Sequence, residues 1–174
     1  MQDHPRLQRL SAALYWVALA LSVLLPIIVL VYAGKGVSDP ASLLSRAPLV
    51  PAGTPVTSLQ AGLVAALALI SVLPMVAALR RMVQLFGAYR DGEVLSRDNA
   101  DTILRIGRNL LIVAAFTVLV PTLQTLILSW SAAQRMLSIG LDQGTLGFLM
   151  AAGLLTVIGW AMRATSPTRP SPGR

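Results

Sequence analysis

The sequence predicts an all-α, integral membrane four-helix bundle, and three observations lead to this prediction. Of the 174 residues, 55% are apolar and only 12% are charged, about half of the roughly 25% found in soluble domains. The charges are also segregated, so that four long apolar windows contain none. An uncharged apolar stretch of about 18 residues or more is typical of a membrane-spanning helix.

The four uncharged windows locate the predicted spans. We expect them near residues 10–33, 58–79, 109–131 and 144–162, forming one membrane domain over residues 10–163. At 1.5 Å per residue, such helices match or exceed a hydrocarbon core of about 30 Å. Residues 1–9 form a short polar tail, and residues 164–174, rich in Ser, Pro and Arg, are expected to be disordered.

Two features of the spans have more than one interpretation. The apolar run from residue 12 to 33 exceeds the ~7–15 residues of a signal-peptide core, so we interpret it as a retained span, with cleavage as the alternative. Pro26, Pro74 and Pro121 lie inside the first three spans. Proline kinks a helix and membrane helices tolerate such kinks, so we interpret them as packing features, with hinges as the alternative.

The basic residues predict the orientation. Thirteen Arg and one Lys, against seven acids, give a net charge of +7. Eleven of the basic residues lie in segment 80–108 or at the two chain ends, whereas only Lys35, Arg46 and Arg135 lie on the other side. Because basic segments stay in the cytoplasm, both termini and segment 80–108 are expected on the cytoplasmic side of a bacterial inner (plasma) membrane. Topology thus explains the positive charge, and no direct nucleic-acid binding is expected.

Segment 80–108 is predicted to extend spans two and three as a cytoplasmic helical hairpin. Leu79, Met82 and Phe86 recur at helical spacing, so the second span should continue beyond the membrane. Gly92 suits the end of this helix, because glycine adopts the left-handed conformation of a C-cap. Residues 92–95 would form the tip of the hairpin.

The second helix of the hairpin has its own start signal. Ser96 is a credible N-cap, since its hydroxyl can accept a bond from a free backbone N–H group. Asp101 lies four residues from both Arg97 and Arg105, and oppositely charged side chains at this spacing stabilise a helix. We therefore expect a continuous helix from about residue 97 into the third span.

The run LRRMVQLFGAYRDGEVLSRDNADTILRIGRNLL, residues 79–111, resembles the signature of a bacterial membrane family called domain of unknown function 2975. Segment 138–141 before the last span also resembles the family, whereas the C-terminal tail departs from its usual charged helix. The resemblance implies a four-span inner-membrane protein that acts as a regulator or sequesters a small helix-turn-helix regulator. The shared positions are Leu85, Phe86, Tyr89, Gly92, Val94, Leu95, Ser96, Asn99, Arg105, Ile106 and Gly107.

The hairpin combines more polar and aromatic residues than any other segment. This favours a non-enzymatic regulatory or scaffolding protein that binds a cytoplasmic partner there, and the resemblance suggests a helix-turn-helix regulator as that partner. The candidate partner-binding residues are Phe86, Tyr89, Arg90, Glu93, Leu95 and Asn99.

Motifs of known chemistry are absent from the sequence. There is no P-loop, no dinucleotide fingerprint, no zinc-protease motif and no nucleophile elbow. The chain has no cysteine, and its one histidine is His4. The hairpin acids lack the spacing of a calcium loop. We assign no catalytic, cofactor-binding or metal-binding residue and expect no enzymatic activity.

The third span carries a polar face formed by Thr117, Gln124 and Thr125. Hydrogen bonds between helices are the favoured explanation. The alternative is a small channel or transporter subunit in which this face lines a path. The spans contain no charged residue, which argues against an ion-coupled transporter.

Two further features concern partners within the membrane. Gly147 and Ala151 have the four-residue spacing that permits close helix packing. We interpret this as packing within the bundle, with homo-oligomerisation as the alternative. Arg80 and Arg81 could bind anionic lipid heads, although orientation already accounts for them. The lipid bilayer is the partner that composition predicts directly.

Overall fold

The computed structural model describes residues 4–44, 50, 54–91, 97–132 and 143–165. Within these ranges the chain is helical and contains no strand, so the predicted all-α class is confirmed. In chain order the elements are α1 (His4–Ser38), α2 (Ala41–Leu44), α3 (Ser58–Arg90), α4 (Arg97–Leu128), the 3₁₀ helix η1 (Ser129–Ser131) and α5 (Gln143–Thr165).

Four of these helices are long and apolar enough to cross a membrane, over Arg9–Ser38, Ser58–Arg90, Asp98–Leu128 and Gln143–Ala164. They coincide with the four predicted spans and are compatible with a multi-pass membrane protein. All four are longer than the predicted spans, because the helices continue into the polar residues that flank the apolar runs. α1 begins at His4, inside the predicted polar tail, and α3 continues to Arg90, as its periodicity predicts.

The start of α3 is fixed by a capping box and by a bond to α4. The backbone N–H of Thr57 donates to Oε1 of Gln60 at 2.8 Å, and the N–H of Gln60 donates to Oγ1 of Thr57 at 3.3 Å. This reciprocal pair satisfies N–H groups that a helix start otherwise leaves free. Nε2 of Gln60 also donates to the carbonyl of Ile127 at 2.8 Å, which ties the start of α3 to the end of α4.

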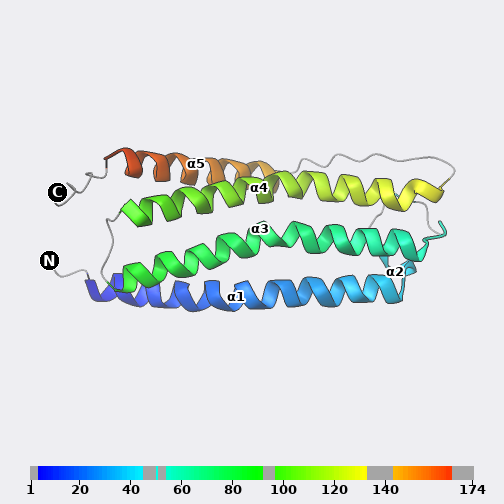
Figure 1. The fold of residues 1–174 in the computed structure, drawn as a ribbon, viewed down its shortest axis with the longest axis horizontal. Helices are drawn as coiled ribbons and strands as arrows, with labels where there is room; N and C mark the ends of the chain where they lie inside the picture. Colours follow the sequence, from blue (N-terminus) through cyan, green and yellow to red (C-terminus); the bar gives the residue numbers. More distant parts are fainter. Residues whose placement is uncertain (1–3, 45–49, 51–53, 92–96, 133–142, 166–174) are drawn as a thin grey trace, which may run out of the picture.

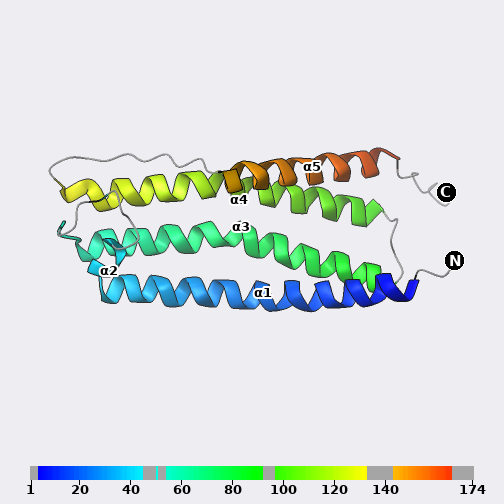
Figure 2. The ribbon, with the colours of Figure 1, turned by 180° about the vertical axis from the view of Figure 1, so that it is seen from behind.

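The long helices pack in chain order as a row. α1 packs on α3, α3 on α4 and α4 on α5, and α1 and α5 lie on opposite sides of the α3–α4 pair (Figures 1 and 2). α5 is shorter and lies beside the first part of α4. A closed four-helix bundle therefore stays a prediction, and the described helices form an open arrangement.

α4 and α5 approach each other closely at two glycines. A Cβ atom at Gly107 would lie 2.8 Å from the backbone N of Thr156, and one at Gly159 would lie 2.6 Å from the backbone N of Leu104. Neither position has room for a side chain, so glycine permits the two backbones to touch. A Cβ at Gly147, by contrast, would have nothing within 4 Å. The packing of α5 on α4 thus does not use the Gly147 pattern singled out in the sequence.

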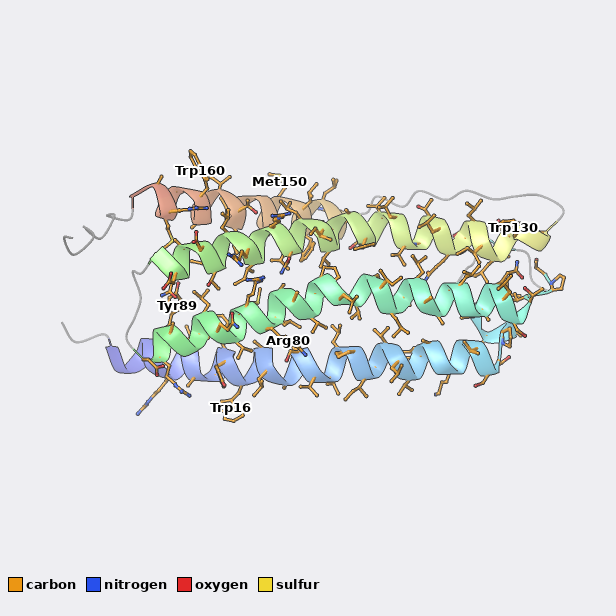
Figure 3. The ribbon with its side chains drawn as sticks, in the orientation of Figure 1. Trp16, Arg80, Tyr89, Trp130, Met150 and Trp160 are labelled. Carbon is orange, nitrogen blue, oxygen red and sulfur yellow. The ribbon has the colours of Figure 1, made fainter. Side chains whose placement is uncertain are left out.

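Large apolar side chains cover the outside of the helices. Trp16, Met150 and Trp160 have exposed fractions of 64%, 76% and 66% and point away from the neighbouring helices (Figure 3). Soluble monomers rarely expose contiguous apolar surface on this scale. Such a surface is compatible with helices that span a membrane.

Two buried apolar clusters join neighbouring helices, one at each end of the molecule. One contains Val50, Val64 and Leu128, packed against the short helix α2 through Leu43 and Leu44. The other contains Leu85, Ile103 and Ile106, with half-buried side chains from α3, α4 and α5 around it. The second cluster lies in the segment predicted as a hairpin.

Candidate functional site

The hairpin segment lies at the end of the molecule where α1 begins, α3 ends, α4 begins and α5 ends (Figure 1). We call this the arginine end. Ile106 is 1% exposed and packs with Leu85 and Ile103, while Leu155 and Met162 of α5 cover the same cluster. Three helices are therefore joined here around one apolar core, which makes this end a fixed platform. Its placement outside the membrane stays a prediction.

The candidate partner-binding residues divide into inward-facing and outward-facing groups. Tyr89 is half-buried against the Leu85 cluster, Phe86 is also half-buried, and Asn99 is buried. Arg90 is exposed. The remaining candidates, Glu93 and Leu95, lie outside the described residues, as do the predicted caps Gly92 and Ser96.

Arg90 contacts α1 through an aromatic ring. Its guanidinium carbon lies 5.4 Å from the ring centroid of Tyr15, a cation–π distance. Its Nε lies 3.7 Å from Oδ1 of the exposed neighbour Asp91. A shallow cavity of about 570 Å³ lies beside this contact, between α1 and the end of α3. Arg90 therefore combines a structural contact with access to solvent.

Sequence reasoning did not assign Tyr15 to the site. The structure places its ring 3.9 Å from the position that a Cβ atom would take at Gly87. Gly87 gives the ring room to lie against α3. A small residue one turn before Arg90 was the signal that could have indicated this contact.

Asp101 forms an ion pair between helices. Its Oδ1 lies 3.3 Å from Nε of Arg163 at the end of α5, within ion-pair range although the geometry is not that of a hydrogen bond. The predicted pair with Arg105 is not formed by the described side chains, and the side chain of Arg97 lies outside them. The sequence-based prediction missed this pairing because α5 is distant in the chain.

The polar face of α4 is largely satisfied within its own helix. Oγ1 of Thr117 donates to the carbonyl of Val113 at 3.0 Å, and Oγ1 of Thr125 donates to the carbonyl of Pro121 at 2.9 Å. Thr117 is exposed, Gln124 is half-buried and Thr125 is buried. These positions do not gather the three side chains around one described cavity, and the channel alternative stays a prediction.

The residues described here show no cluster of three or more His, Asp or Glu side chains that could hold a metal ion. The non-enzymatic character of the chain remains an expectation from its sequence. Comparisons of the chain with protein-family models, with curated proteins and with solved structures find no match.

Proposed function

We propose that this chain is a non-enzymatic, multi-pass inner-membrane protein that regulates or scaffolds a cytoplasmic partner bound at its arginine end. The observation that carries the proposal is the shared core at this end, where α3, α4 and α5 pack around Leu85, Ile103 and Ile106. A site held on packed helices loses less conformational freedom on binding than a flexible one does, which favours recognition.

The surface of this platform supports a polar partner. Arg90, Asp91, Asp98 and Arg105 are exposed around the apolar core. Mixed charges of this kind favour specificity and orientation in association more than raw affinity. A small helix-turn-helix regulator is the partner that we propose, on the resemblance of residues 79–111 to the domain of unknown function 2975 family.

The proposed orientation places the arginine end and both termini in the cytoplasm. Arg90 and Arg105 belong to helix segments at this end, and Lys35 lies toward the other end of α1. Basic residues flanking spans are retained on the cytoplasmic side. A cytoplasmic regulator would then meet the platform directly.

Site-specific photo-crosslinking tests this function. A photoreactive amino acid at Asp98 should form adducts with a protein partner in living cells, because this side chain is exposed at the arginine end. The matched control is Leu59, which is 74% exposed and lies at the start of α3, away from the arginine end. Protein adducts at position 98 and lipid adducts at position 59 would support the proposal. Lipid adducts alone at both positions would remove it.

A further inference from the structure

We propose that a groove between α1 and α3 binds an anionic phospholipid, with its phosphate at Arg80 and Arg81 and an acyl chain along α3. The groove is a cavity of about 510 Å³. Its apolar wall is formed by Pro26 of α1 and by Val72, Leu73, Val76 and Ala77 of α3.

The polar end of the groove is formed by Arg80, Arg81 and Gln84. Leu73, Ala77 and Arg81 are spaced four residues apart, and residues at this spacing share one helix face. This face therefore changes from apolar to cationic along the axis of α3. An acyl chain attached to a phosphate has the same polarity along its length, so the groove and a phospholipid match in chemistry and direction.

The two arginines have no anionic partner within the described part of the chain. The ion pairs found there involve Arg90 and Arg163, and neither Arg80 nor Arg81 contributes to one. Both guanidinium groups line the same cavity, so an anion bound there would be attracted by two positive charges. Arginine binds phosphate oxygens in a bidentate geometry, which makes a phosphate the anion best suited to this pair.

The tryptophans indicate where the membrane lies. Trp16 and Trp160 lie toward the arginine end and Trp130 at the opposite end (Figure 3). Gly159, the neighbour of Trp160, lies against Leu104 of α4. From Leu104 to Trp130 the chain runs about 26 residues, which at 1.5 Å per residue separates the levels of Trp160 and Trp130 by roughly 39 Å. Tryptophan favours the two membrane interfaces, and a bilayer with its headgroup regions is about 40–45 Å thick. The match sets the arginine-end interface near Trp16 and Trp160.

Arg80 and Arg81 lie closer to the membrane centre than this interface. Tyr15, next to Trp16, meets Gly87 and Arg90 of α3, and the two arginines precede these residues by six to ten positions, or roughly 9–15 Å. Figure 3 shows Arg80 nearer the middle of the molecule than Trp16. A charged side chain at this depth is costly unless it is paired. A lipid phosphate drawn into the groove supplies the missing charge.

Lipid titration of the purified full chain in maltoside detergent, followed by native mass spectrometry, tests this site. The probes are phosphatidylglycerol, phosphatidylcholine and inorganic phosphate. The double variant Arg80→Gln/Arg81→Gln should bind phosphatidylglycerol about 25-fold more weakly than the unmodified chain, at roughly fivefold per arginine. The matched control is Arg105→Gln/Arg108→Gln, which removes two exposed charges from α4 outside the groove.

A third variant separates lipid binding from general charge and from misfolding. Ala77→Trp fills the apolar wall while both arginines remain, and it should weaken binding of phosphatidylglycerol as well, with helix content unchanged by circular dichroism. Equal losses in the two arginine double variants, or equal affinity for phosphatidylglycerol and phosphatidylcholine, would overturn the proposal. Inorganic phosphate binding as tightly as phosphatidylglycerol would overturn the assignment to a lipid. These outcomes are independent of the crosslinking result at position 98.

Discussion

Replacing Gly159 by alanine tests how closely α5 approaches α4. The added methyl group would lie 2.6 Å from the backbone N of Leu104 and 2.8 Å from its Cα. Non-bonded carbon atoms prefer about 3.5–4.0 Å, so the helices must separate there by roughly 1 Å. The obstacle is backbone, which cannot turn aside as a flexible side chain can.

The expected cost follows from two opposing terms. Overpacking a tight contact costs about 1–3 kcal/mol, whereas replacing glycine by alanine within a helix favours the helix by up to about 1 kcal/mol. We therefore expect Gly159→Ala to lower the free energy of unfolding by about 1–2 kcal/mol. Gly153→Ala is the matched control on the same helix, because a Cβ there meets nothing within 4 Å. It should be neutral or slightly stabilising.

Equilibrium unfolding of both variants in mixed micelles, followed by circular dichroism, measures this difference. Gly159→Ala should unfold at a lower denaturant fraction than the unmodified chain, and Gly153→Ala should not. Equal behaviour of the two variants, or a larger loss at position 153, would refute the close approach of α4 and α5 at Leu104.

Three further predictions concern caps, charges and orientation. Thr57→Ala removes the side-chain acceptor of the α3 capping box and should lower the free energy of unfolding in the same assay by about 1 kcal/mol; an unchanged value would contradict the role of the cap. Asp101→Asn should cost no more than about 0.5 kcal/mol, because its ion pair is more than one-third exposed and screened by solvent; a loss above about 2 kcal/mol would show a more buried pair. The chain has no cysteine, so Asp98→Cys and Asp39→Cys each introduce one labelling site. An impermeant maleimide applied to spheroplasts should label position 39 and not position 98, and the reverse pattern would invert the proposed orientation.

The sequence predicted the four long helices well because the length and apolar character of each segment determine them. Four uncharged apolar windows became four long helices, and the helical spacing of Met82 and Phe86 correctly predicted that α3 continues to Arg90. Pro26, Pro74 and Pro121 lie inside helices as expected. Helix length and hydropathy depend on the local sequence, so they can be predicted without knowledge of the neighbouring helices.

The faces that these helices present to one another were not predictable. Gly147 had the spacing of a packing motif, yet the close contacts use Gly107 and Gly159. A helix that is apolar on all sides has no stripe that distinguishes a helix-facing side from a lipid-facing side. Small residues show where close approach is permitted, and only the partner helix decides which of them is used.

The candidate site shows the same limit. Tyr89 and Asn99 were selected as an exposed binding surface, and the structure turns Tyr89 toward the Leu85 cluster and buries Asn99. Aromatic and amide side chains serve packing and recognition equally well, so their presence in one segment does not separate the two roles. The Asp101–Arg163 pair was not predicted for a related reason. The spacing rule for charge pairs within a helix favoured partners four residues from Asp101, whereas Arg163 lies on another helix.

The packing of the long helices in chain order has a consequence for biogenesis. α1 has its main partner in α3, and α5 has its main partner in α4. The first pair can therefore assemble while α4 is still being synthesised, whereas the α3–α4 seam needs both halves of the chain. A gene divided between the codons for residues 91 and 97 should yield two fragments that insert separately and then reassociate along that seam.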